Sequence, residues 1–100
     1  MELRNARIIA YDIEDDGVRQ RVARYLEGQG LRIQKSVFIV NLPKNRLAEV
    51  RSKLAGLCED GDVIDIIPVC ASCRTASVRI GPELAPAIVA LGTALSEGET

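Results

Sequence analysis

The chain has 100 residues, with 13 basic and 14 acidic side chains and neither His nor Trp. This length is enough for one domain with a modest core, and the absence of His excludes Ser–His, Cys–His and histidine–metal chemistry. The near-zero net charge hides an asymmetry, because residues 1–53 hold eleven Lys and Arg against seven Asp and Glu, whereas residues 54–100 hold two against seven. The composition is therefore compatible with one basic face that binds a polyanion.

The first predicted element is a strand over the apolar run 8–13, which suits a central position in a sheet. Alternation along a strand places Ala10 and Asp12 on one face. The residues on the other face are apolar: Ile9, Tyr11 and Ile13.

A helix is expected after this strand, over roughly 16–28. Asp15 and Asp16 are suitable N-cap residues, and either Gly28 or Gly30 can end the helix. Negative charge is favoured at the start of a helix, so we interpret these acids as helix-starting residues and not as catalytic ones.

Residues 31–42 form a second extended region, which is either one bent strand or two strands with the bend at 34–36. A second helix then begins at Pro43 or Asn45. Its apolar stripe has the spacing of a core-facing helix: Leu47, Val50, Leu54 and Leu57.

The remaining elements are shorter. Residues 62–69 predict a strand, in which Pro68 marks the end of the strand or the edge of the sheet. Residues 77–80 predict a further short strand, and the apolar tail 87–95 predicts either a short helix or a frayed end.

The predicted order is β-α-β-β-α-β with an extra strand, which indicates a ferredoxin-like α+β fold with an antiparallel sheet and both helices on one face. Two helices with short connections supply too few crossovers for a parallel α/β sheet. We expect one domain over 1–80 and a tail over 81–100. A small protein with an open apolar sheet face usually has a partner, so we expect a homodimer.

Asp12 is the residue that does not fit an apolar strand. A carboxylate there costs several kcal/mol to bury unless it is paired or bound to a metal. It is either an exposed residue at the strand end, capping the turn, or a ligand for a hard cation such as Mg²⁺. A single Asp is a poor metal site, and two copies that meet across a twofold axis make a better one.

Several cations follow this strand. Arg19, Arg21 and Arg24 lie on the predicted first helix, where Arg21 and Arg24 share a face, and Arg32 and Lys35 come soon after. Such a group can contact phosphates, although solvated helix faces have the same composition.

Cys70 and Cys73 form a single C-x-x-C, and Cys58 lies apart from them. One such pair without further Cys or His is a weak zinc signal, so we interpret it as a structural turn. A disulfide and an intersubunit metal site remain alternatives.

The sequence also predicts a compartment. The N-terminal residues are charged and polar, so no signal peptide is expected. No apolar run approaches the roughly 20 residues of a membrane span. An odd number of cysteines without a secretion signal suggests a reducing environment. We therefore expect a cytoplasmic protein with no membrane contact.

Two stretches, AYDIEDDGVRQRVARYLEGQGLRIQKSVFIVNL at 10–42 and IIPVCASC at 66–73, carry a family resemblance. The chain closely resembles the second core family of CRISPR-associated proteins, the small subunit of spacer adaptation. The markers are YDI at a strand end, D-x-x-x-R over a helix start, G-L-x-x-Q-x-S-V-F and the late C-x-x-C. The likeness covers residues 6 to about 80 and leaves the tail without a family pattern.

The resemblance implies a ferredoxin-like homodimer whose late strand completes the partner's sheet. It also implies that Asp12, one from each protomer, binds Mg²⁺ or Mn²⁺ and is catalytic. Further implied site residues are the nucleic-acid-binding Arg19, Arg21 and Arg32, with Tyr11 and Phe38 supporting the substrate site or the interface. Lys35 stands where the family varies, so the resemblance assigns it no role.

Two functions follow from this resemblance. The first is a metal-dependent endonuclease on RNA or DNA, which acts with the CRISPR integrase subunit in spacer acquisition. The second is a purely structural adaptor that bridges DNA while the integrase performs catalysis. A third interpretation, a ferredoxin-like regulatory module for a small molecule, needs no basic face and ranks below both.

Overall fold

Seven helices and strands follow one another within residues 5–82, which are the residues that the computed structural model describes. In chain order they are β1 (Ala6–Asp12), α1 (Asp16–Glu27), β2 (Gly30–Gln34), β3 (Val37–Asn41), α2 (Lys44–Leu57), β4 (Val63–Pro68) and α3 (Ala71–Ala76). The predicted order is thus confirmed as far as β4, and residues 31–42 are two strands joined at Lys35 and Ser36.

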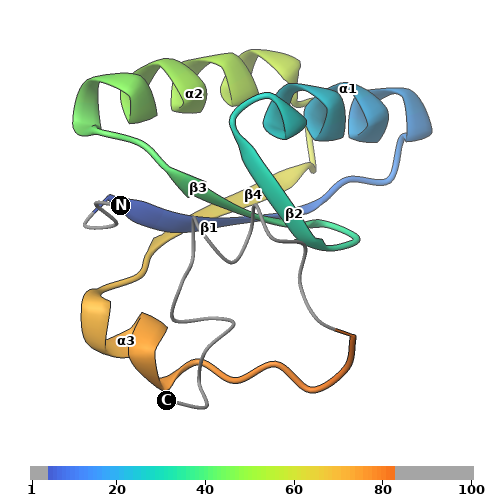
Figure 1. Ribbon diagram of the computed structural model, residues 1–100. Helices are drawn as coiled ribbons and strands as arrows, with labels where there is room; N and C mark the ends of the chain where they lie inside the picture. The colour runs from blue at the N-terminus through green and yellow to red at the C-terminus, as the bar shows by residue number, and fades with distance from the viewer. Residues whose placement is uncertain (1–4, 83–100) are drawn as a thin grey trace.

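The strands form one sheet in the order β2-β3-β1-β4, with antiparallel pairing between all neighbours. α1 and α2 cross over one face of this sheet, and α3 lies on its other side (Figure 1). This arrangement confirms the predicted ferredoxin-like α+β fold. The domain division at residue 80 stays a prediction.

Local signals in the sequence set the ends of α1. The Asp15 side chain accepts a hydrogen bond from the Val18 N–H at 2.9 Å, as an N-cap should. Asp16 adds negative charge to the first turn, and Gly28 caps the C-terminus. These contacts confirm the helix-starting role of the acids, and they show that Asp15, not Asp12, caps the turn.

The core lies between the two long helices and the sheet. Ile9, Tyr11 and Phe38 project from β1 and β3 toward α1, whose Val18, Val22 and Leu26 are fully buried. The paired residues of β1 and β4 share a face in this antiparallel sheet. Asp12 therefore projects, together with Val63, from the face that α1 and α2 leave uncovered.

The segment after β4 differs from the predicted one. Cys70 and Cys73 do not form an isolated turn, because Cys70 caps the six-residue helix α3. The buried Arg74 anchors this helix by donating a hydrogen bond to the Val69 carbonyl at 2.9 Å. No apolar periodicity marks so short a helix in the sequence.

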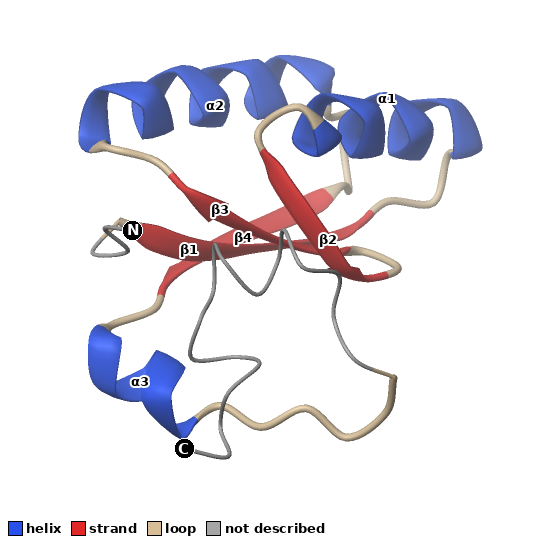
Figure 2. Cartoon of the chain, viewed as in Figure 1, coloured by secondary structure: helices blue, strands red, loops and turns tan. Residues whose placement is uncertain are grey.

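Residues 77–80 form no strand within the single chain and run as a loop after α3 (Figure 2). The predicted crossing strand could form only in an assembly, and it stays a prediction. The tail helix predicted over 87–95 lies outside the described residues. Of the helices in residues 5–82, none has the length and apolar character needed to span a membrane.

Candidate functional site

A hollow of about 440 Å³ lies where α1, the end of β1 and the β2–β3 turn meet. We call it the basic hollow, because three of its lining side chains are cations. Its lining residues are Tyr11, Arg19, Gln20, Ala23, Arg32, Lys35 and Ser36. Predicted site residues from three separate elements thus converge on one surface depression.

Arg19 is held at the hollow by its own backbone surroundings. Its guanidinium donates to the carbonyls of Ile13 and Glu14 at 2.9 and 3.1 Å, and it is also paired with Asp16. These contacts order the side chain while 41% of its surface remains exposed. An ordered, exposed guanidinium loses less conformational entropy when it binds a phosphate than a freely moving one does.

Arg32 lies over a pair of stacked aromatic rings. Its guanidinium lies 5.1 Å from the centroid of the fully buried Phe38 ring, which in turn stacks on Tyr11 with a centroid distance of 6.3 Å. A cation over an aromatic face is attracted by the ring quadrupole. Phe38 therefore supports Arg32 from beneath and does not itself face solvent.

Tyr11 also fixes the turn between β2 and β3. Its backbone N–H donates to the Ser36 carbonyl at 3.0 Å, and its hydroxyl donates to the Lys35 carbonyl at 3.4 Å. Both bonds join residues more than twenty positions apart in the chain. They place Lys35 at the hollow. The sequence grouped Lys35 with the candidate phosphate-contacting arginines and the family resemblance assigned it no role, and nothing local in the sequence ties this turn to β1.

Two of the predicted site residues lie outside the basic hollow. Arg21 is exposed on α1 but does not line it, because residues two apart on a helix face different sides. Asp12 follows Tyr11 directly, yet strand alternation directs it to the opposite face of the sheet.

Asp12 is exposed at the end of β1, and Asp65 of β4 is exposed on the same sheet face. Carboxylate oxygens are the donors that Mg²⁺ and Mn²⁺ prefer, and Mg²⁺ is commonly held by one or two carboxylates together with water and substrate phosphates. Asp12 fits such an ion in donor type. Among residues 5–82 of a single chain, however, no group of three or more metal-ligating side chains gathers.

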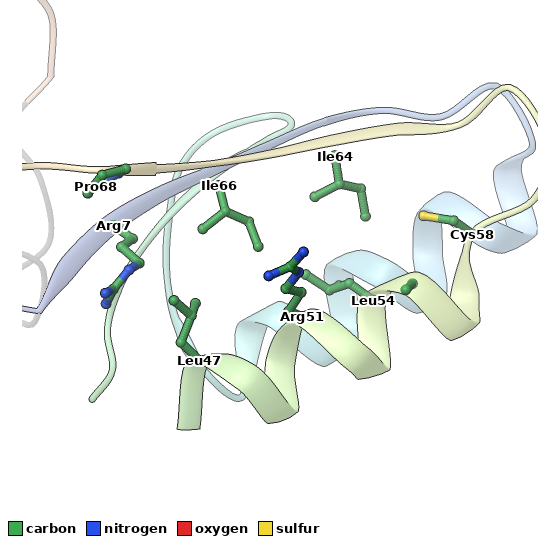
Figure 3. Close-up of a pocket in the computed structure, with 9 residues that line it drawn as sticks. Arg7, Leu47, Arg51, Leu54, Cys58, Ile64, Ile66 and Pro68 are labelled. Carbon is green, nitrogen blue, oxygen red and sulfur yellow. The ribbon is translucent and has the colours of Figure 1, made fainter. Parts of the chain in front are cut away.

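A second depression, of about 540 Å³, lies between α2 and β4 (Figure 3). Leu47, Leu54, Ile64 and Ile66 form its apolar part, and Arg7 and Arg51 stand beside it. This α2–β4 groove holds no acid, so it offers no metal site. It leaves part of the predicted α2 stripe accessible next to the outer edge of β4.

Comparison with known proteins gives the family. The family model described as CRISPR associated protein Cas2 matches residues 5–76. A relative from Chloroflexus aurantiacus named CRISPR-associated endoribonuclease Cas2 1 is 41% identical over 76 residues, which cover 74% of this chain and 82% of the relative.

Solved structures agree with this match. The hypothetical protein TT1823 from Thermus thermophilus is 35% identical, with a TM-score of 0.65 over 67% of this chain and 83% of the other. Streptococcus pyogenes Cas2 has a TM-score of 0.68 over 76% of this chain and 99% of the other, and at 17% identity it shows the fold alone. The chain therefore belongs to the Cas2 family of CRISPR-associated proteins.

Proposed function

We propose that this protein is a nucleic-acid-binding homodimer that acts with the CRISPR integrase subunit in spacer acquisition and cleaves RNA or DNA phosphodiesters with Mg²⁺ or Mn²⁺. The observation that carries the proposal is the basic hollow, where Arg19, Arg32 and Lys35 converge beside the strand end that bears Asp12. The name of the Chloroflexus aurantiacus relative adds support for an endoribonuclease.

The basic hollow suits a phosphate backbone in charge and in donor type. Arginine offers paired N–H donors that match phosphate oxygens, and lysine adds a point charge. Asp16 pairs with Arg19, and Glu27 pairs with Arg32. Neither acid lines the hollow itself. Phosphate contacts of this kind position a nucleic acid without reading its sequence.

Cleavage would depend on Asp12. In each protomer this exposed carboxylate would hold the divalent ion, with its copy in the partner completing the site. Such an ion, when bound, neutralises charge on a phosphodiester and lowers the pKa of a water molecule bound to it. Arg19, Arg32 and Lys35 would bind and orient the flanking phosphates, so the chain needs no histidine base for this chemistry.

The homodimer is supported by an unpaired edge and an unpaired segment. β4 is the outer strand of the described sheet, and its Val63 and Ile67 are about half exposed. Val78 and Ile80 alternate in the loop that follows α3, with 77% and 97% of their surfaces exposed. Adding residues 77–80 to the partner's β4 would satisfy a strand edge and bury both side chains.

The adaptor function is the second candidate. It is favoured by the position of Asp12, which projects from the sheet face opposite the basic hollow. In this case the basic hollow binds DNA and the integrase subunit performs the catalysis. Asp12 is then dispensable for spacer integration.

The two candidates are separated by replacing Asp12 with Asn. The purified homogeneous protein would be incubated with labelled RNA and duplex DNA in Mg²⁺, Mn²⁺ or EDTA, beside the Asp60→Asn variant as a charge-matched control at an exposed position. The nuclease hypothesis predicts that Asp12→Asn loses metal-dependent cleavage, whereas Asp60→Asn retains it. Both variants should keep the fold and nucleic-acid binding.

Spacer integration with the integrase subunit gives the second measurement. Integration that survives Asp12→Asn identifies the adaptor role as the principal one. Equal cleavage by Asp12→Asn and the parent would show that Asp12 is no ligand, and failure of the parent to bind any nucleic acid would overturn the proposal as a whole.

A further inference from the structure

Cys70 and Cys73 are the two cysteines of the chain that are exposed, and their sulfur atoms lie 3.2 Å apart. A disulfide bond has a sulfur–sulfur length of about 2.05 Å, so small side-chain rotations suffice to close this gap. The two residues sit at the start of α3, where Arg74 ties the helix to Val69. The two sulfur atoms therefore already lie close to bonding distance while both cysteines are reduced.

The two thiols differ in their surroundings. The Cys73 N–H donates to the Cys70 sulfur at 3.4 Å, and this bond together with the Cys73 thiol lowers the pKa of Cys70. The hydrogen bond between the two thiols, together with the charge of Cys70, raises the pKa of Cys73. Because the thiolate is the nucleophile in thiol–disulfide exchange, Cys70 is suited to attack first and Cys73 to resolve.

Cys58 gives a reference within the same chain. It is half-buried at the α2–β4 groove, and burial, with Asp62 nearby, raises the pKa of its thiol. It thus has the chemistry of an inert structural cysteine.

We propose that Cys70 and Cys73 form a reversible dithiol–disulfide couple, a redox modification site that small-molecule or protein disulfides oxidise. The Cys70 thiolate attacks one sulfur of the oxidant's disulfide, and that S–S bond breaks to release a thiolate, which takes up a proton. Cys73 then loses its proton and attacks the Cys70 sulfur, which releases the second thiol of the oxidant. Two protein thiols are oxidised to one disulfide, and one disulfide is reduced to two thiols.

This inference does not rest on the proposed function. The pair lies in the segment that leads from β4 to residues 77–80, and it lines neither the basic hollow nor the α2–β4 groove. Disulfides that form in a reducing compartment are typically transient and regulatory or catalytic, which suits an exposed couple.

The test equilibrates the full-length protein in glutathione buffers of graded oxidised-to-reduced ratio and counts free thiols by maleimide labelling and mass. The parent and the Cys58→Ser variant should each show two fewer maleimide-reactive thiols after oxidation. Their mass should fall by two hydrogens, with no glutathione added. Cys73→Ser, which keeps the N–H and a hydroxyl donor beside Cys70, should accumulate one glutathione at Cys70. Cys70→Ser should take up glutathione at Cys73 more slowly.

Four results would overturn the proposal. They are retention of all three thiols in excess oxidised glutathione, modification of Cys58 as fast as Cys70, disulfides that join two chains instead of closing within one, and stoichiometric zinc that blocks oxidation until it is chelated. Circular dichroism of each variant checks the fold, and nucleic-acid binding, measured in parallel, tests the proposed function separately.

Discussion

Tyr11 and Asp12 are neighbours in sequence, and they act on opposite faces of one sheet. Tyr11 packs in the core, stacks on Phe38 and holds the β2–β3 turn through two hydrogen bonds. Asp12 projects from the uncovered face. Because side chains alternate along a strand, a single strand end can organise the basic hollow on one side and present a carboxylate on the other.

The residue-scale prediction concerns the cations of the basic hollow. Arg32→Gln and Lys35→Gln should each weaken RNA and DNA binding and reduce the slope of log affinity against log salt by about 0.7–0.9 for each lost phosphate contact. Binding would be measured by fluorescence anisotropy over a salt series.

Arg24→Gln is the matched control, because it removes the same charge from an exposed position of α1 that does not line the hollow. An equal loss in slope for Arg24→Gln would mean that binding follows total charge and not the hollow. Arg21→Gln in the same series tests the predicted nucleic-acid contact of Arg21, which lies outside the hollow.

At the scale of the elements, close contact between β2 and β3 depends on Gly30. A Cβ built on Gly30 would lie 2.2 Å from the Ile39 carbonyl oxygen and 2.7 Å from a Val40 side-chain carbon. Because the carbonyl is backbone, it can move only if β3 shifts with it. Gly56, in contrast, lies within α2, and apart from its chain neighbours and the backbone of its own helix no atom lies within 4 Å of a built Cβ.

Gly30→Ala should therefore lower the free energy of unfolding by about 1–3 kcal/mol, as overpacking in a tight site does. Gly56→Ala should raise it by up to about 1 kcal/mol, since Gly is a poor helix former. Urea unfolding at one fixed protein concentration gives both midpoints. Coincident midpoints for the two variants would contradict the packing described for β2.

At the scale of the whole molecule, the first half of the chain carries the excess of positive charge and supplies every lining residue of the basic hollow. The second half supplies the β4 edge and the exposed segment 77–80. The proposed nucleic-acid binding and the proposed self-association thus fall to different parts of one small domain, and they should respond to different changes.

Removal of residues 77–100 should abolish the homodimer or cause aggregation, because the β4 edge of each copy loses its expected partner. Removal of residues 83–100 alone should leave the dimer intact, since 77–80 is retained. Sedimentation velocity at several concentrations distinguishes the two truncated chains. A stable, soluble dimer of residues 1–76 would show that another surface holds the copies together.

The sequence by itself determined β1, α1, α2 and β4, the ferredoxin-like fold class and the faces of β1, because these follow from periodicity, caps and turns within a few residues. Only the structure divided residues 31–42 into β2 and β3. Asp15, Gly28 and the Ile9–Tyr11 alternation all act locally. Only the tertiary structure placed Lys35 beside Arg19, removed Arg21 from the hollow and brought the Cys70 and Cys73 sulfurs together. These outcomes depend on strand register, on hydrogen bonds between distant residues and on which way a side chain leaves its helix, and none of these leaves a local pattern in the chain.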